Sequence, residues 1–491
     1  MIDFTIQKEG LAHNIAKARE NGILIPTIGQ MQHPETIPEK VQAKLKNVGM
    51  GDVDPLNLFR ITWKNEPVES GGLFRQVPNY IELPSSLTGV PCRIVAMVGK
   101  WFPTGCHKVG ASFGCLAPRL VTGQFDVERH KAVWPSTGNY CRGGAFNSRL
   151  LGAQGVAILP AEMSRERFDW LHAIGAQVIA TPGCESNVKE IFDKTNELKQ
   201  DPQYMIFNQF EEMGNPLWHY NVTGNALADV YEAIKRPGDR FAGAAFTSGS
   251  AGTMSAGDLL KEKYPHLKLA VGEALQCPTI LENGFGGHRI EGIGDKHIPW
   301  IHNVKNTDMV IDIDDEDSQR LLRLFNTPEG QAYLKNELHL DDELIEKLTW
   351  LGISGIANVL CCIKMAKYYE FTERDVVGTV LTDSAVMYGS RIQELNDQYG
   401  AYNAHEAAMD HALHMLGLKL DNMQELTYAD RKRVHNLKYY TWVEQQGKTV
   451  EELNALWYDT EGTWDTVHAQ AKDLDDLINA FNEATGLLKD L

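Results

Sequence analysis

Lys108 is the first residue whose type and setting suggest chemistry. It stands in the segment PTGCHKVGAS, residues 103–112, where a turn of small residues leads toward a predicted helix. A lysine amine at such a helix start can reach into a pocket, and when shielded from water it can form a Schiff base with an aldehyde. The alternative is a solvated surface charge, which is the commoner state of a lysine. Lys108 by itself does not decide between the two.

A polar turn forms the second segment of interest, PSTGNYCRGGA, residues 135–145. Ser136, Thr137, Gly138 and Asn139 lie between a predicted strand and a predicted helix. Backbone N–H groups at a helix start suit a carboxylate, and the Asn139 amide can donate to a phenolic oxygen. An ordinary turn that caps a helix is the alternative.

Glycine and hydroxyl residues alternate in the third segment, FTSGSAGTMSAG, residues 246–257. Such a loop ahead of a helix presents a nest of N–H groups that can bind a phosphate. Its spacing fits neither the P-loop nor the dinucleotide fingerprint. The loop therefore suits a single phosphate, unless it is merely a flexible connection.

Ser354 is the candidate in the fourth segment, WLGISGIANVL, residues 350–360. Its hydroxyl, at a turn before a helix, can hydrogen-bond a pyridine nitrogen without forcing that nitrogen to stay protonated. Taken alone, Ser354 would be read as a helix N-cap.

The elements that must hold these segments alternate from Pro91 to about Gly400. Short β-branched runs predict buried strands, and amphipathic stretches between them predict helices, a rhythm typical of parallel sheets covered on both faces. Such sheets bind ligands at the carboxyl ends of their strands. The predicted strands are CRIVAMV, AVWPS, GVAIL, AQVIA, YMIFNQF, FAGAAFTS, KLAVGEA and VVGTVLT. The flanks differ, because residues 1–85 show weak periodicity and residues from 401 onward look helical.

The overall composition excludes some partners. Lys and Arg number 47 against 65 Asp and Glu, so the formal charge is −18, which argues against nucleic acid and anionic membranes as partners. No apolar run is long enough to predict a membrane span, and the N-terminus has no core of signal-peptide length. The eight cysteines are scattered, without metal-ligand spacing, and are expected to be free thiols in the cytoplasm.

The order of the four segments resembles that of the fold type II pyridoxal-phosphate enzymes, the superfamily of cysteine synthase, cystathionine β-synthase and tryptophan synthase β. Three further segments are similar to stretches of cysteine synthases: NQFEEMGNPLWHYNVTGNAL, GGHRIEGIGDKHIPW and LTDSAVMYGS. The resemblance implies an α/β fold with two doubly wound parallel-sheet domains and pyridoxal 5'-phosphate between them. It further implies a large cofactor-binding domain of residues 86–130 and 231–400 and a small substrate-clamping domain of residues 131–230. Residues 1–85 and 401–491 would then be extensions packed on this core.

The resemblance also implies a role for each candidate residue. Lys108 would form the Schiff base with the cofactor and move the substrate's α-proton, while Asn139 would contact the ring hydroxyl and Ser354 the pyridine nitrogen. The glycine-rich loop would bind the phosphate, and the polar turn would hold the substrate carboxylate. The phosphate loop comprises Ser248, Gly249, Ser250, Ala251, Gly252 and Thr253, and the substrate residues are Ser136, Thr137, Gly138 and Tyr140. Gly292 and Ile293 would line the pocket near the cofactor.

Departures from the family pattern leave the substrate open. Lys108 is followed by V-G-A-S rather than the Asp-Arg of many relatives, and Tyr140 replaces a common threonine after Asn139. We expect an enzyme that eliminates or replaces the β-substituent of a small amino acid and that is a homodimer. The alternatives are a β subunit of an amino-ketoacid thiolase or acyl transferase working with a partner subunit, and a non-catalytic protein that kept the fold.

Several reactive residue types are expected to serve packing alone. Cys106, Cys361 and Cys362 are predicted to be buried core residues. His405, His411 and His414 share helical spacing but lack an evident fourth ligand, so no metal site is predicted.

Overall fold

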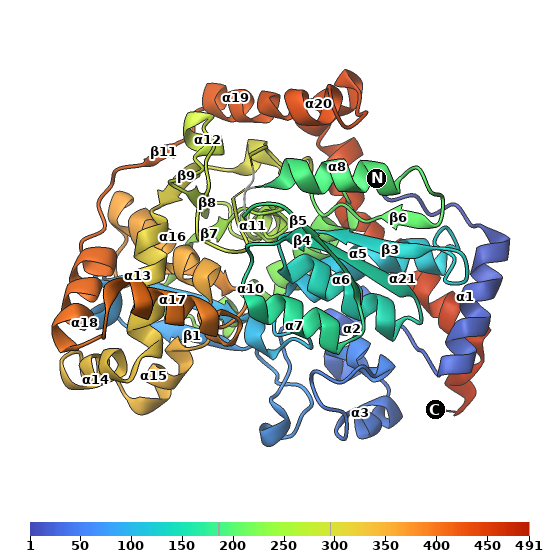
Figure 1. Ribbon diagram of the computed structural model, residues 1–491, viewed down its shortest axis with the longest axis horizontal. Helices are drawn as coiled ribbons and strands as arrows, with labels where there is room; N and C mark the ends of the chain where they lie inside the picture. The colour runs from blue at the N-terminus through green and yellow to red at the C-terminus, as the bar shows by residue number, and fades with distance from the viewer. Residues whose placement is uncertain (185–186, 295, 491) are drawn as a thin grey trace.

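The computed structural model describes residues 1–184, 187–294 and 296–490. Two β-sheets form the centre of the molecule, and helices cover their faces (Figure 1). The α/β fold with parallel sheets that the strand–helix rhythm predicts is confirmed.

Among the described residues, seven strands build the larger sheet in the order β1-β2-β10-β7-β8-β9-β11. The five inner strands run parallel, whereas β1 and β11 pair antiparallel at the two edges. Both edge strands come from the ranges expected to be extensions, so these ranges complete the sheet as well as covering it. The strands are β1 Tyr80–Leu83, β2 Arg93–Val98, β7 Arg240–Thr247, β8 Lys268–Ala274, β9 Met309–Ile313, β10 Asp375–Leu381 and β11 Met423–Glu425.

The smaller sheet has four parallel strands in the order β5-β4-β3-β6. The residues of β3 are buried after its first position and those of β4 after its second, which explains their nearly continuous apolar runs. The strands are β3 Lys131–Pro135, β4 Gln154–Pro160, β5 Gln177–Thr181 and β6 Tyr204–Ile206.

Helices connect the strands and form both extensions. In the first half of the chain they are α1 Lys8–Asn21, α2 Ile28–Gln32, α3 Glu39–Leu45, α4 Ser85–Thr88, α5 Lys108–Val121, α6 Asn139–Leu150, α7 Arg165–Ala173, α8 Val188–Leu198, α9 Gly214–Trp218 and α10 Asn225–Ile234. In the second half they are α11 Met254–Lys263, α12 Thr279–Glu282, α13 Asp315–Asn326, α14 Pro328–Asn336, α15 Asp342–Leu348, α16 Ile353–Tyr368, α17 Gly389–Tyr399, α18 Ala404–His411, α19 Tyr428–Lys438, α20 Val450–Tyr458 and α21 Thr466–Thr485. The region from residue 401 onward is mostly helical, with β11 as its one short strand among the described residues.

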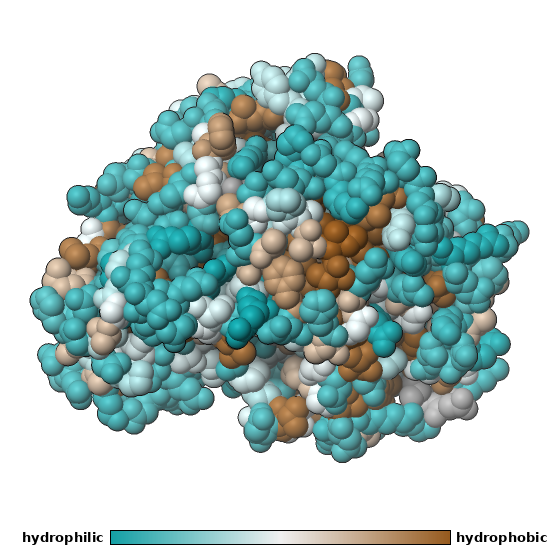
Figure 2. All heavy atoms as spheres, viewed as in Figure 1, coloured by the Kyte–Doolittle hydropathy of each residue, from teal (hydrophilic) through white to brown (hydrophobic). Residues whose placement is uncertain are grey.

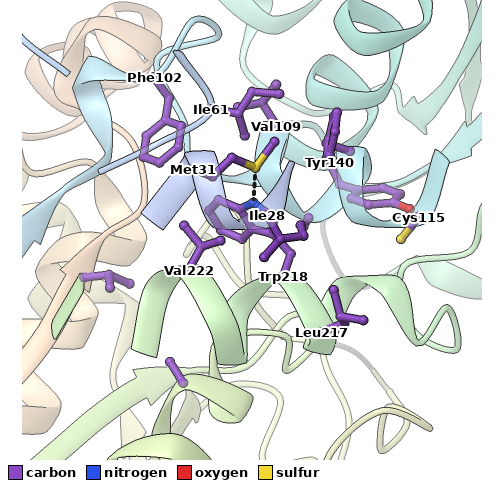
Figure 3. Close-up of a cluster of buried hydrophobic side chains, with 14 of the residues drawn as sticks. Ile28, Met31, Ile61, Phe102, Val109, Cys115, Tyr140, Leu217, Trp218 and Val222 are labelled. Carbon is purple, nitrogen blue, oxygen red and sulfur yellow. Dashed lines mark hydrogen bonds between the residues drawn. The ribbon is translucent and has the colours of Figure 1, made fainter. Parts of the chain in front are cut away.

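The N-terminal extension packs into the core beside the lysine segment. Ile28 and Met31 of α2 join a buried cluster with Val109 of α5 and with Trp218, whose indole Nε1 donates to the Met31 sulfur at 3.2 Å (Figure 3). This cluster fixes the helix that begins at Lys108 against the N-terminal segment.

The C-terminal extension packs on two separate parts of the molecule. Its last helix, α21, packs on α1 near the N-terminus, whereas α19 and α20 lie across the top in Figure 1. The aromatic side chains of Phe210, Trp300, Trp442 and Trp464 form a separate buried cluster beneath them.

The surface in the view of Figure 2 is mostly hydrophilic, with brown patches confined to limited areas. Within the described ranges, no single helix has both the length and the apolar composition to cross a bilayer; α15 and α16 pass that test only as a pair bent by 111°.

Candidate active site

Lys108 begins α5, directly after the turn of residues 103–107. Its Nζ donates to Ser250 Oγ at 2.8 Å and to Gln209 Oε1 at 3.3 Å. Ser250 belongs to the glycine-rich loop after β7, and Gln209 follows β6. The fold therefore brings the lysine amine and the predicted phosphate loop together. Gln209 is a site residue that the sequence interpretation did not name, although it lies in the quoted NQF segment.

The glycine-rich loop, residues 248–253, is packed too tightly to accept side chains at its glycines. A Cβ at Gly252 would lie 2.1 Å from Asn215 Oδ1, and one at Gly249 would lie 2.8 Å from Gly292 O. Ala251 adopts a φ of 62°, a left-handed conformation that turns the chain sharply. Asn215 Nδ2 also donates to Ser250 Oγ at 3.1 Å, so Asn215 supports the loop from behind.

The polar turn of residues 136–139 joins β3 to α6, and Asn139 is the first residue of that helix. Asn139 Nδ2 donates to Asp383 Oδ2 at 2.8 Å, and Asn139 Oδ1 accepts from Arg142 Nη1 at 3.3 Å. A donor on one side and an acceptor on the other leave the amide a single orientation. The second N–H of Asn139 then remains available to a ligand.

Ser354 and Asn139 face the same space across Gly292. A Cβ at Gly292 would lie 3.6 Å from Ser354 Oγ and 3.9 Å from Asn139 Nδ2. Ser354 is 1% exposed, and its hydroxyl makes no hydrogen bond within the described structure. This buried hydroxyl can therefore donate to a ligand in the space that it shares with Asn139.

Tyr140 does not join these residues. Its ring packs edge-on against Trp134 at 5.4 Å, and its hydroxyl lies beside Cys115 in the hydrophobic cluster (Figure 3). Successive residues of a helix point about 100° apart, so Tyr140 faces the core while Asn139 faces the site. Tyr140 is 1% exposed in this arrangement, and its contact with a substrate stays a prediction.

Two histidines next to the site are held neutral. Burial lowers the pKa of His107 and of His219 well below the usual range, and each lies beside the positive charge of Lys108. The His219 ring fills the space next to Gly252, and its Nδ1 lies 2.9 Å from Thr223 Oγ1. These imidazoles therefore shape the site without adding charge to it.

Asp383 is the buried carboxyl of the site. Burial raises its pKa, although the neighbouring Arg167 guanidinium and the hydrogen bond from Asn139 oppose that shift. Tyr388 also donates to Asp383 Oδ2 at 2.7 Å. Neither Asp383 nor Tyr388 was named from the sequence, although both lie in the quoted segment LTDSAVMYGS.

A cleft of about 540 Å³ opens next to Glu291, the residue before Gly292. It lies between the segment after β4 and the large-sheet side of the molecule. Met163, Ser164 and Arg165 line one wall, and His288, Glu291 and Arg391 line the other.

The three cysteines predicted to be core residues are buried, and two of the three histidines contact neighbouring groups. Cys106, Cys361 and Cys362 are fully buried, and burial raises the pKa of the Cys106 thiol to about 12. His411 contacts the carbonyl of Leu87 at 2.8 Å, and His414 contacts Asp317 at 2.7 Å.

The donors of the site fit pyridoxal phosphate. Lys108 offers an amine, the glycine-rich loop offers hydroxyls in a tight turn, and Ser354 offers an unpartnered hydroxyl opposite the Asn139 amide. The segments that carry them follow β2, β3 and β7 or begin α16, so they meet at the carboxyl ends of parallel strands.

Comparisons with known proteins agree with this chemistry. The sequence pattern of the family described as pyridoxal-phosphate dependent enzymes matches residues 86–333. A cysteine synthase of Staphylococcus aureus (strain Mu50 / ATCC 700699) is 32% identical over 257 residues, which are 52% of this chain and 74% of that protein. A cystathionine beta-synthase of Apis mellifera is 29% identical over 254 residues, 49% of this chain and 48% of that protein.

Solved structures share the fold. A cysteine synthase from Entamoeba histolytica superposes with a TM-score of 0.56 at 20% identity and covers 70% of this chain and 94% of its own. An O-acetylserine dependent cystathionine beta-synthase from Helicobacter pylori gives 0.53 at 24% identity, with 64% and 95% covered. The chain therefore belongs to the family of pyridoxal-phosphate dependent enzymes, has their fold type II architecture and depends on that cofactor.

Proposed function

We propose that this enzyme removes the α-proton of a small amino acid and then eliminates or replaces its β-substituent. Serine, O-acetylserine and cysteine are the substrates that we favour. Relatives named cysteine synthase and cystathionine beta-synthase support this chemistry. The observation that carries it in this chain is the Lys108 amine, 2.8 Å from Ser250 Oγ in a glycine-rich loop.

Lys108 would hold the cofactor as a Schiff base and then move the α-proton. When bound, the cofactor ring accepts the electrons that the α-carbon releases. The residues that would hold its phosphate are Ser248, Gly249, Ser250, Ala251, Gly252 and Thr253. Asn139 would donate its remaining N–H to the ring hydroxyl.

Ser354 would set the strength of that electron sink. Its hydroxyl is neutral, so a hydrogen bond to the ring nitrogen does not fix a positive charge there. This moderate partner suits elimination across the α and β carbons.

Ser136, Thr137 and Gly138 would bind the substrate's carboxylate. The turn lies at the start of α6, where backbone N–H groups and the helix dipole favour an anion. Burial of Ser136 and Thr137 keeps water from competing for the same donors.

We also propose that the enzyme is a cytoplasmic homodimer. Cys92, Cys106, Cys115, Cys141, Cys361 and Cys362 are free thiols, which suits a reducing compartment. Sedimentation equilibrium would measure the mass of the assembly, and a monomer would contradict this part of the proposal.

A visible absorption titration tests the function. Purified protein with added pyridoxal phosphate should develop a yellow band, and one of a panel of amino acids should shift it. Release of ketoacid and ammonia would indicate elimination, whereas consumption of an added thiol or sulfide would indicate replacement. A band that no small amino acid shifts would contradict the proposal.

A further inference from the structure

Arg167 of α7 is fully buried behind the polar turn of residues 136–138. Its Nη1 donates to Thr137 O at 2.8 Å, its Nη2 donates to Tyr388 OH at 2.9 Å, and its Nε lies 3.2 Å from Glu291 Oε2. The sequence interpretation assigned Arg167 no role.

The partners of Arg167 come from both halves of the molecule. Thr137 follows β3 of the small sheet, whereas Tyr388 follows β10 of the large sheet and Glu291 precedes Gly292. Tyr388 in turn donates to Asp383 Oδ2, the oxygen that also accepts from Asn139. A buried guanidinium is tolerated only when it is well paired, so this arrangement exists only while the two halves are seated together.

The hydrogen bond from Arg167 sets the direction of one peptide group. A trans peptide is planar, so its C=O and N–H point in opposite directions. With the Thr137 carbonyl turned to Arg167, the Gly138 N–H points away from it and donates to Ser136 Oγ at 3.1 Å. A hydroxyl that accepts in this way still has its own hydrogen to donate.

Gly138 supplies independent support for this contact. Its φ of 147° is one that residues with a side chain rarely adopt, and a Cβ there would lie 2.1 Å from Arg167 Nη1. The guanidinium thus occupies the place that a side chain at position 138 would need.

We propose that Arg167 is the positioning residue of the substrate turn. It orients the Thr137–Gly138 peptide so that the Ser136 hydroxyl can donate to the substrate's carboxylate. This role rests on the proposed function, in which the turn binds that carboxylate. Because Tyr388, Asp383 and Glu291 hold Arg167, amino-acid binding depends on the seating of the small sheet against the large one.

Two conservative variants test the role. Arg167→Lys keeps the charge but cannot reach Thr137, Tyr388 and Glu291 at once. Tyr388→Phe removes the hydroxyl that accepts from Arg167 and donates to Asp383. The matched controls lie elsewhere: Arg323, fully buried and bonded to Asn396, is changed to Lys, and Tyr402, which donates to Asp410, is changed to Phe. These controls report the general cost of losing a buried arginine or tyrosine contact.

The measurements separate cofactor binding from amino-acid binding. Absorption titrations give the affinity for pyridoxal phosphate and, from the amino-acid-induced band shift, the dissociation constant of the amino acid. Arg167→Lys and Tyr388→Phe should raise that constant and KM about tenfold or more, and Arg167→Lys should keep kcat and cofactor affinity near those of the wild type. Such a change in KM alone marks a contact that serves the bound substrate and the transition state equally.

Three outcomes would overturn the role. The first is an amino-acid affinity that stays within about twofold of the wild type in both variants. The second is a loss of amino-acid affinity in the two control variants equal to that in Arg167→Lys and Tyr388→Phe. If Arg167→Lys does not fold, the result for Tyr388→Phe decides. A wild-type protein that binds pyridoxal phosphate but no amino acid would instead overturn the proposed function and this role with it.

Discussion

Gly252 offers a direct test of the phosphate loop. In Gly252→Ala the added methyl would lie 2.1 Å from Asn215 Oδ1 and 2.8 Å from His219 Cδ2, and both side chains are buried. Asn215 cannot move without changing its hydrogen bonds to Gln209 O at 3.0 Å and to Ser250 Oγ at 3.1 Å. The loop itself must therefore shift.

The size of the effect follows from these contacts. Forcing a methyl group into a packed site costs about 1–3 kcal/mol, and losing the bond between Asn215 and Ser250 costs about 1 kcal/mol. Without cofactor the loop can relax, but a bound phosphate requires its original shape, so the cost falls on binding. A total of about 2–4 kcal/mol corresponds to an affinity for pyridoxal phosphate that is about 30- to 1000-fold weaker.

The assay is a titration of cofactor-free protein with pyridoxal phosphate, followed by visible absorption. Gly51→Ala is the matched control, because a Cβ there meets open space within 4 Å. The control should bind the cofactor as the wild type does. An affinity of Gly252→Ala within about threefold of the wild type would refute the assignment of this loop to the phosphate.

Three further changes test other parts of the molecule. Lys108→Ala should abolish the visible band and turnover, and unchanged turnover would refute its assignment as the Schiff-base lysine. Burial raises the pKa of Asp258 from 3.8 to about 7, so the folded protein binds an extra proton between about pH 4 and 7 and loses stability as the pH rises through that window. Asp258→Asn removes this loss, which is on the order of 4 kcal/mol. In urea unfolding, the free energy of unfolding of the variant should therefore rise relative to that of the wild type from about pH 4 to 7. A difference between the two that does not change with pH would contradict this cause. Trp442→Ala, which empties a buried site and removes the 2.8 Å bond to Ile298 O, should lower the free energy of unfolding by about 3–5 kcal/mol, as urea titration would measure.

The inner strands were predictable because burial on both faces leaves nearly unbroken apolar runs. The predicted strand KLAVGEA coincides with β8, and CRIVAMV begins one residue before β2. The two edge strands were not predicted, because Tyr80–Leu83 and Met423–Glu425 are short and their pairing depends on contacts with distant residues. The run MVIDI of β9 carries a strand signal of the same kind, although it is not among the strands predicted from the sequence.

The four site segments were predictable because their chemistry is local to each turn. What closes the site depends on long-range contacts: Asn139 and Asp383 are 244 residues apart in sequence. Arg142 had a local signal, since it lies three residues after Asn139 and so on the same helix face. Arg167 had no local signal, because its partners Thr137 and Tyr388 follow strands of two different sheets.

The C-terminal extension bears on the site even though it lies outside the matched family region. Trp442 packs against Phe192 of α8 at 6.5 Å and against His297 at 5.6 Å between ring centroids. Phe192 lies on a helix of the small sheet, whereas His297 lies five residues after Gly292, the glycine that Ser354 and Asn139 face. Trp442 therefore contacts both a helix of the small sheet and the segment after Gly292, and any movement of one against the other must rearrange this aromatic cluster. The extension thus constrains the position of the small sheet relative to the large one, on which the contacts of Arg167 also depend.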